Sequence, residues 1–276
     1  MPRIKFFLIV AAVPAIALAQ TPCEQLKSLK LADTTITLTE SAGPGAFQLP
    51  GAPPTAVGPL LPAFCRVAAI LKPSLDSEIK IEVWLPAGGA WNGKYLGVGG
   101  GGWVGSINYG AMAAALRDGY ATSSTDTGHT GPTAEFAVGH PEKVTDFAYR
   151  AVHEMTAKAK AIMAAHYGRG PRLSYWTGCS TGGRQGLMEA QRYPADFDGI
   201  IAGAPANNQI QLSAWRFALE TGALKDPARV VPLAKTTLLK SRRARRVRFP
   251  RRRQRRISVR STKVPVRSFD AVVPRT

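Results

Sequence analysis

Long apolar segments are almost absent from this chain of 276 residues. Apart from residues 6–19, no stretch is both apolar and long enough to cross a bilayer, so we expect a soluble mature protein. Internal repeats are also absent, which leaves no sign of a repeat architecture. Hydrophobic residues still make up 45% of the chain, enough for an ordinary globular core.

The one apolar run has the features of a secretory signal. Arg3 and Lys5 precede it, Pro14 interrupts it, and a small-x-small cleavage site ends at Ala19. An uncleaved membrane anchor is the alternative, but a run this short with an internal proline is a poor span. We therefore predict a signal peptide at residues 1–19 and a secreted or periplasmic mature protein.

Acidic residues are few, with 18 Asp and Glu against 36 Lys and Arg. The imbalance is concentrated in residues 241–276, which hold thirteen Arg, one Lys and one Asp but no Gly, Leu or Glu. Such a composition buries too little apolar surface to fold, so we expect a disordered tail. It is either a functional basic arm or an out-of-frame translation of a GC-rich gene, and we favour the second. Export and the lack of interleaved aromatic residues argue against a nucleic-acid partner.

Cysteine is scarce as well, with three residues in the chain. An oxidising compartment would allow Cys23 and Cys65 to form a disulfide that ties the Pro-rich N-terminal stretch to the body. Cys179 is then left over, either as a free thiol or as one half of a bridge whose other half is missing.

The remaining sequence alternates between strand and helix patterns. In the second predicted strand, Ile79, Ile81 and Val83 alternate with other residues at the period of a half-buried strand. This alternation predicts an α/β fold, with a mostly parallel sheet and helices on both faces. The predicted strands are 34–38, 64–71, 79–85, 94–98, 120–123, 173–177 and a buried strand at 200–202; the predicted helices are 109–118, 143–167, 183–192, 215–221 and 226–239.

A Gly-x-Ser-x-Gly motif at residues 178–182 lies between a predicted strand and a predicted helix. That context is the nucleophile elbow of an α/β-hydrolase, in which a tight turn exposes the serine hydroxyl. We therefore predict Ser180 as the nucleophile of an esterase. The N–H group of Thr181, at the start of the helix, is predicted to hold the oxyanion. A glycine-rich turn with an incidental serine is the alternative.

Four consecutive glycines at residues 99–102 directly follow another predicted strand. In esterases an upstream glycine-rich loop supplies the second N–H group of the oxyanion hole, and we assign this role to Gly100 and Gly101. A flexible loop without a role is the alternative. A phosphate-binding loop is disfavoured because no Lys-Ser/Thr pair follows.

Several of these segments together resemble the tannase and feruloyl esterase family. The segments are Gly-Cys-Ser-Thr-Gly-Gly-Arg-Gln at 178–185, the glycine-loop segment at 95–103, Ser-Thr-Asp-Thr-Gly-His at 124–129 and the strand at 197–205. The resemblance covers about residues 20–240. It implies an exported serine esterase that cleaves esters of aromatic acids through an acyl-enzyme. It also implies a disulfide between the cysteine beside the nucleophile and one beside the catalytic histidine, and a lid insertion with a calcium site.

The chain departs from this family pattern in three respects. The triad order of the fold places a histidine after the nucleophile, but His129, His140, His153 and His166 all precede Ser180. No partner cysteine for Cys179 is present, and the acidic calcium loop is missing, so no metal or cofactor is expected. We interpret His129 as a residue of the pocket wall.

His153 and His166 are expected on the surface of the long helix. Asp196 and Asp198 are expected to be structural.

These observations give a plan of the chain. A signal peptide at 1–19 is followed by an α/β-hydrolase domain at 20–205, the start of a lid at 206–240 and the Arg-rich tail at 241–276. The fold is expected to be incomplete at its C-terminal side, and missing strands would expose apolar surface on its last edge.

The predicted function is hydrolysis of small feruloyl or galloyl esters, weak or absent in this form. A lipase is a near competitor that differs in substrate. The alternative of another class is a non-catalytic secreted cationic protein that binds acidic polysaccharide or membrane surfaces through its tail.

Overall fold

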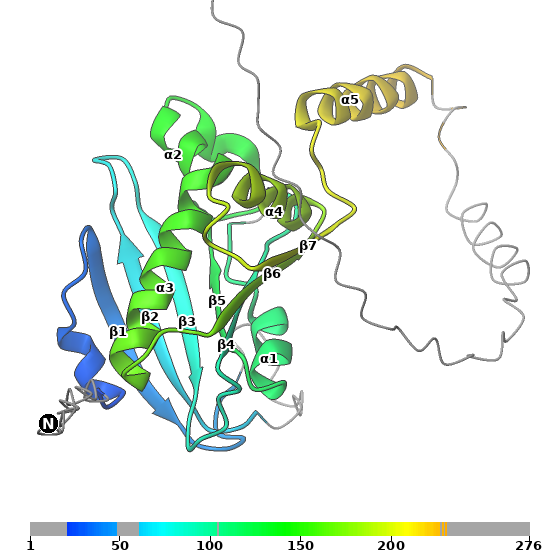
Figure 1. Ribbon diagram of the computed structural model, residues 1–276. Coiled ribbons are helices and arrows are strands. Elements are labelled where there is room, and N and C mark those ends of the chain that lie inside the picture. Colours follow the sequence, from blue (N-terminus) through cyan, green and yellow to red (C-terminus); the bar gives the residue numbers. More distant parts are fainter. Residues whose placement is uncertain (1–20, 49–60, 104, 227, 229, 231–276) are drawn as a thin grey trace, which may run out of the picture. The chain divides into compact units, whose positions relative to one another are not determined.

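A computed structural model describes residues 21–48, 61–103, 105–226, 228 and 230 (Figure 1). The chain divides into two units, one ending at Ser213 and the other beginning at Ala214, and each is described by itself. The predicted signal peptide and the Arg-rich tail lie outside the described residues. In the part that is described, no helix is long and apolar enough to span a membrane.

The first unit is built around a seven-stranded mixed sheet in the order β1-β2-β3-β5-β4-β6-β7. The pairs β1–β2, β2–β3 and β3–β5 are antiparallel, and β5, β4, β6 and β7 form a continuous parallel half. The strands are β1 (Thr34–Ala42), β2 (Phe64–Leu71), β3 (Ile79–Pro86), β4 (Lys94–Val98), β5 (Ala121–Thr125), β6 (Leu173–Cys179) and β7 (Gly199–Gly203). The predicted α/β architecture is confirmed.

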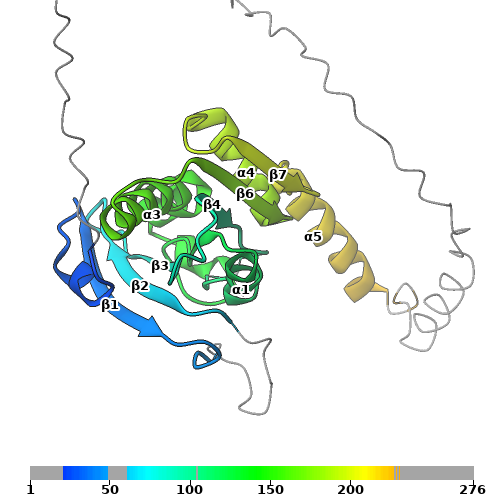
Figure 2. The ribbon, with the colours of Figure 1, turned by 60° about the horizontal axis from the view of Figure 1, so that its bottom comes forward.

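Helices cover both faces of this sheet, as predicted (Figure 2). Helix α1 (Tyr109–Arg117) packs Met112 and Leu116 into a core cluster with Trp84. Helix α3 (Ala151–Tyr167) packs into the larger cluster on the opposite face, together with Trp176 of β6. Helix α4 (Thr181–Arg192) follows β6 directly and contacts both β6 and β7.

The helix predicted over 143–167 is divided into three consecutive segments. α2 (Pro141–Thr145) leads into a π-helical turn, Asp146–Arg150, and α3 continues from there. Asp146 is fully buried in this turn, where its Oδ1 accepts a hydrogen bond from Arg150 Nε at 2.6 Å. The wider turn is one that insertion of an extra residue into a helix produces, and apolar periodicity alone does not reveal it.

Strand β3 is buried on both faces rather than half-buried as predicted. Trp84 lies in the core cluster under α1, and Glu82 is also buried. The Glu82 carboxylate is satisfied by Arg66 at 2.5 Å, by the Tyr109 hydroxyl at 2.7 Å and by Trp84 Nε1 at 2.9 Å. A buried charge is tolerated where it has such partners, which explains why the polar residue does not mark a solvent face.

Strand β7, predicted to be buried, is instead an edge strand of the described sheet. Ile201 on this strand is 70% exposed. The prediction was wrong because an apolar run marks a buried strand only where neighbours cover both faces. The expectation that this last edge exposes apolar surface agrees with the structure.

A disulfide joins Cys23 and Cys65, as predicted, and links the 3₁₀ helix Glu24–Ser28 to β2. Cys179 is a free, exposed thiol. Helix α5 (Gln209–Lys225) runs from the end of the first unit into the second and includes the helix predicted at 215–221. Most of the helix predicted at 226–239 lies outside the described residues.

Candidate active site

Ser180 lies on a sharp turn between β6 and α4. Its backbone has φ 58° and ψ −116°, a conformation that residues other than glycine rarely adopt. Hydrogen bonds hold the turn: Ser180 N–H donates to Gly203 O at 3.0 Å, and Ser180 O accepts from the N–H groups of Arg184 and Ala206, each at 3.0 Å. Ser180 is exposed at the carboxyl end of β6. This is the strained, exposed geometry of a nucleophile elbow.

Close backbone contacts explain the glycines around the turn. A Cβ atom added to Gly178 would lie 2.5 Å from the carbonyl carbon of Gly182. One added to Gly182 would lie 2.9 Å from Gly100 O, and one added to Gly183 would lie 2.4 Å from Gly203 O. No side chain fits at these distances, so the elbow requires the three glycines for its packing.

The glycine loop after β4 packs against the first turn of α4. A Cβ atom on Gly99 would lie 2.6 Å from Gly182 Cα, which shows how closely the two backbones approach. The Thr181 hydroxyl donates to Gly102 O at 2.9 Å. The structure therefore brings together the two segments to which the sequence assigned the oxyanion hole.

Two side chains that sequence reasoning missed orient the glycine loop. Gln185 Oε1, on α4, accepts a hydrogen bond from Gly100 N–H at 3.2 Å. Asn108 Nδ2 donates to Gly99 O at 2.8 Å, and Asn108 Oδ1 also caps the first turn of α1 by accepting from Ala111 N–H at 3.2 Å. Gln185 stands within the motif that carried the family resemblance, whereas nothing in the sequence singles out Asn108.

The candidate oxyanion donors differ in whether the N–H group already has an acceptor. Gly100 N–H already has the Gln185 amide oxygen as its acceptor. Thr181 is the first residue of α4, so its N–H belongs to the group of helix N-terminal donors that have no partner within the helix. The positive end of the α4 dipole lies at the same place.

A cavity of about 310 Å³ borders the glycine loop. It is lined by Gly100, Gly101 and residues 106–110 at the start of α1. Backbone groups and the Ser106, Asn108 and Tyr109 side chains give this space polar walls. The cavity is adjacent to the glycine loop, whose Gly100 O closely approaches Gly182 of α4.

His129 is a buried component of the neighbouring loop, with 5% of its surface exposed. Its Nε2 lies 2.7 Å from Trp103 O, its Nδ1 lies 3.4 Å from the Thr127 hydroxyl, and its ring stacks on Phe136 at 3.8 Å. Both ring nitrogens therefore face groups of the surrounding loops, and the role of His129 in a pocket wall stays a prediction. The same loop is supported by Asp126, whose Oδ1 accepts from Lys80 N–H and Gly128 N–H at 2.9 Å each. Burial raises the pKa of Asp126 to about 6.

The remaining residues for which the sequence predicted no catalytic role are Asp196, Asp198 and the two histidines of α3. Asp198 is structural, as expected: its Oδ2 accepts from Ser174 N–H at 2.7 Å. Both histidines of α3 are partly exposed, and each has a polar partner. His153 Nδ1 lies 2.7 Å from Asp196 Oδ2, and His166 Nδ1 lies 2.9 Å from Thr21 O. Helical position alone does not reveal partners from distant segments.

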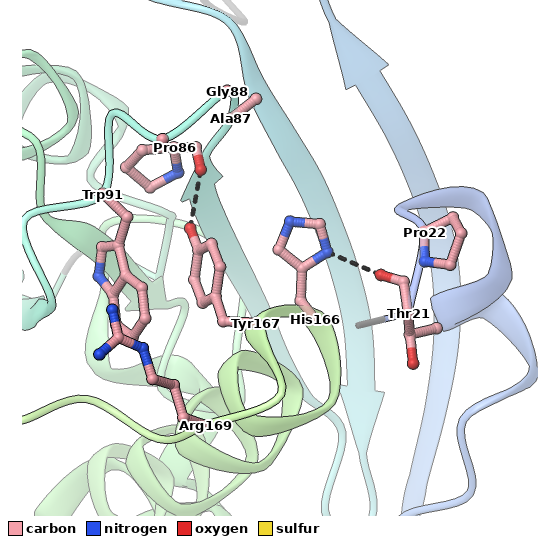
Figure 3. A pocket seen from close by; sticks show the side chains of 10 residues that line it. Thr21, Pro22, Pro86, Ala87, Gly88, Trp91, His166, Tyr167 and Arg169 are labelled. Carbon is pink, nitrogen blue, oxygen red and sulfur yellow. Dashed lines mark hydrogen bonds between the residues drawn. The ribbon is translucent and has the colours of Figure 1, made fainter. Parts of the chain in front are cut away.

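A second cavity, of about 490 Å³, is lined by Trp91, Tyr167 and Arg169, among other residues (Figure 3). It lies at the end of the parallel strands opposite to Ser180. Trp91 stacks on Tyr167 at 3.9 Å between ring centroids, and the Arg169 guanidinium lies 5.3 Å from the Trp91 ring. The Tyr167 hydroxyl donates to Pro86 O at 2.9 Å. Residue 86 ends β3 and residue 91 precedes β4, so this cavity does not adjoin the carboxyl end of β6, where Ser180 lies.

Comparisons with known proteins identify a family and several relatives. Residues 65–244 match the family described as "Tannase and feruloyl esterase". An uncharacterized esterase from Xanthomonas campestris is 44% identical over 208 residues, which are 75% of this chain and 34% of that protein. A probable feruloyl esterase B-1 from Neosartorya fischeri is 45% identical over 161 residues, covering 58% of this chain and 30% of that protein.

Solved structures give the same picture. Feruloyl esterase B from Aspergillus oryzae superposes with a TM-score of 0.66 at 36% identity, over 71% of this chain and 39% of that one. Tannin acyl hydrolase from Aspergillus niger gives 0.52 at 28% identity, over 69% and 35%. The chain spans about a third of the length of these curated relatives. The chain belongs to the tannase and feruloyl esterase family.

Proposed function

We propose that the chain is a carboxylic ester hydrolase that acts on esters of aromatic acids through Ser180. The supporting observation is the conformation of Ser180, exposed at φ 58° and ψ −116° between β6 and the N-terminus of α4. Backbone strain of this kind persists where the surroundings enforce it, and it presents the hydroxyl to a substrate. The substrate class, a feruloyl or galloyl ester, follows from the relatives named above.

In the proposed reaction Ser180 Oγ attacks the ester carbonyl, and the alcohol leaves to give an acyl-enzyme that water hydrolyses. Thr181 N–H and the glycine-loop N–H groups hold the negative charge that develops on the carbonyl oxygen. Between the two assigned glycines, Gly101 is the better donor because Gly100 N–H is held by Gln185 Oε1. Gly100 then acts through the shape of the loop.

We further propose that the 276-residue chain alone is a weak catalyst. No histidine follows Ser180 in the sequence, and both ring nitrogens of His129 already contact Thr127 and Trp103. Without a general base the serine is poorly activated, although an oxyanion hole and binding still give about 10³–10⁴-fold over water in a related triad.

A rescue experiment tests the nucleophile and the missing base together. Hydrolysis of methyl ferulate and methyl gallate is measured for the chain and for Ser180→Ala across a series of imidazole concentrations. Subtracting the variant removes direct catalysis by imidazole. We expect the Ser180-dependent rate to rise with imidazole, because free imidazole supplies the base. Equal rates for the two proteins at every concentration would refute Ser180 as the nucleophile, and a turnover of about 10 s⁻¹ without imidazole would refute the weak-catalyst proposal.

We also propose export through residues 1–19. The disulfide between Cys23 and Cys65 supports this proposal, because such bonds persist in oxidising compartments. Expression with the native N-terminus in a bacterium, followed by N-terminal sequencing of the periplasmic protein, tests it. The expected mature protein begins at Gln20, and an uncleaved cytoplasmic product contradicts the proposal.

A further inference from the structure

His153, Glu189 and Asp196 form a cluster at the opposite end of α4 from Ser180. His153 belongs to α3, Glu189 to α4, and Asp196 to the turn before β7. Each residue offers one ligand atom, and these three atoms lie within 4.8 Å of one another. Glu189 follows Ser180 by nine positions, so it lies about 13 Å farther along the helix axis. The cluster is therefore separate from the nucleophile.

Glu189 lacks a donor for its carboxylate. Its exposed fraction is 0%, and neither Oε1 nor Oε2 has a hydrogen-bond partner among the described residues. Asp196 is also a carboxylate, so the two groups bond directly only when one of them is protonated, and when both are ionised something positive must lie between them. A buried carboxylate in this condition is expensive to keep.

The positive groups nearby do not resolve this deficit. Lys160 Nζ, on α3, is directed to the backbone oxygen of Asp196, at 2.5 Å, rather than to a carboxylate oxygen. Arg192, near the end of α4, lies over the Tyr149 ring at 4.1 Å. Burial first, and then the negative charge of Asp196, raises the pKa of Glu189 above its usual range, while the charge of Lys160 lowers it.

The donor set has the chemistry of a metal site. One imidazole nitrogen with two carboxylate oxygens suits Zn²⁺ and the neighbouring first-row divalent ions, which bind such atoms at about 2.0–2.2 Å. His153 Nδ1 and Asp196 Oδ2 are now 2.7 Å apart. Two ligands of one tetrahedral or octahedral ion stand about 3.0–3.4 Å apart, so a shift of about half an ångström would admit the ion.

The surroundings favour a fixed site with one open side. The His153 ring stacks on Tyr193 at 3.7 Å between centroids, which orients Nδ1 toward Asp196. The side chains of His153 and Asp196 are 31% and 16% exposed, which leaves access from solvent, whereas Glu189 forms the buried floor. An ion can therefore enter past His153 and Asp196 and be held by the buried Glu189.

We propose that His153, Glu189 and Asp196 bind a divalent cation of the Zn²⁺ class. The ion joins α3 to the C-terminal half of α4 and to the turn that leads into β7. Its role is structural, because it lies too far from Ser180 to touch a reacting ester. This revises the expectation of no metal and does not depend on the proposed esterase activity.

Zn²⁺ titration of the full chain tests the site, with calorimetry for affinity and stoichiometry and Co²⁺ absorption for the ligand set. A Cys179→Ala background removes the free thiol as a competing ligand. We expect one equivalent to bind and to raise Tm. Glu189→Gln and His153→Ala should each weaken binding at least about tenfold, as loss of a ligand exceeds the loss of an outer-shell partner.

His140→Ala is the matched control, because His140 pairs with Asp76 at 3.0 Å on the surface and does not belong to the cluster of His153, Glu189 and Asp196. It should leave Zn²⁺ binding unchanged. The near-isosteric Asp196→Asn replaces any variant that fails to fold. Absence of saturable binding in the parent chain would overturn the proposal, and so would unchanged binding in folded Glu189→Gln and His153→Ala.

Discussion

Thr181 Oγ1 donates a hydrogen bond to the carbonyl oxygen of Gly102 at 2.9 Å, which joins the first turn of α4 to the end of the glycine loop. Thr181 is buried and directly follows Ser180 on the chain. The contact therefore couples the position of Thr181, one proposed oxyanion donor, to the position of the glycine loop, which carries the other proposed donor.

Thr181→Val tests this coupling. Valine keeps the shape of threonine and removes the hydroxyl, so it should cost about 0.5–1.5 kcal/mol in the free energy of unfolding. The part of the hydrolysis rate that depends on both imidazole and Ser180 should fall by more than this loss of stability explains, because the glycine loop is no longer hydrogen-bonded to residue 181. Urea unfolding and the rescue assay measure the two effects. Thr145→Val, which removes a local bond to Pro141 O on α2, is the control and should leave the rate unchanged.

Gly183→Ala should damage the elbow. The added Cβ would meet Gly203 O at 2.4 Å, and backbone cannot move aside cheaply, so we expect about 1–3 kcal/mol of destabilisation. Gly110→Ala in α1 is the contrast, because its Cβ would meet nothing within 4 Å. There alanine should stabilise the helix by up to about 1 kcal/mol. Denaturant midpoints for both variants measure these changes in stability. Equal changes for the two substitutions would contradict the packing argument.

Asp126→Asn should stabilise the protein in a pH-dependent manner. Burial raises the folded-state pKa of Asp126 from 3.8 to about 6. Because the pKa is raised, protonated Asp126 stabilises the folded state. This contribution to the free energy of unfolding is fully present below pH 4 and is lost as the pH rises through 6. The variant keeps an acceptor for Lys80 N–H and Gly128 N–H. Its advantage should grow from about zero at pH 4 to about 2–3 kcal/mol at pH 8.

Unfolding free energies at a series of pH values measure this difference. Asp118→Asn serves as the control, because Asp118 is exposed at the end of α1. Its effect on the free energy of unfolding should be small, because solvent screens an exposed charge. An Asp126→Asn effect that does not change with pH would show that the buried carboxyl does not titrate as described.

Ile201→Lys should reduce self-association. Ile201 is 70% exposed on the edge strand β7, and an exposed apolar edge is a template for pairing with another chain. Sedimentation velocity at rising protein concentration should show less oligomer for the variant than for the parent. Leu75→Lys is the control, since Leu75 is fully exposed in a turn that belongs to no edge strand. A similar effect of both substitutions would assign the change to net charge.

Local sequence predicts the parts of the site that lie close together on the chain. The elbow at 178–182 and the glycine loop at 99–102 are dictated by steric needs within a few residues, and both are where the pattern placed them. The pair Cys23–Cys65 followed from the compartment and from the small number of cysteines.

Contacts between distant segments could not be predicted in this way. Gln185 reaches Gly100 across 85 positions, and His153 reaches Asp196 across 43. Buried Glu189 reads as an ordinary helix residue until α3 and the turn before β7 are placed around it. The π-helical turn at Asp146–Arg150 contains the buried Asp146, which accepts a hydrogen bond from Arg150, and apolar spacing does not indicate this turn.

Trapping the acyl-enzyme tests the central claim, that Ser180 is the nucleophile. The weak-catalyst proposal implies slow deacylation, so an activated ester of ferulic acid should leave its acyl group on the protein. Peptide mass spectrometry of the Cys179→Ala chain, in which the neighbouring thiol cannot compete, locates the group. The account predicts a feruloyl mass on Ser180 that disappears when Ser180→Ala is added. A feruloyl group elsewhere, with Ser180 unmodified, would contradict it.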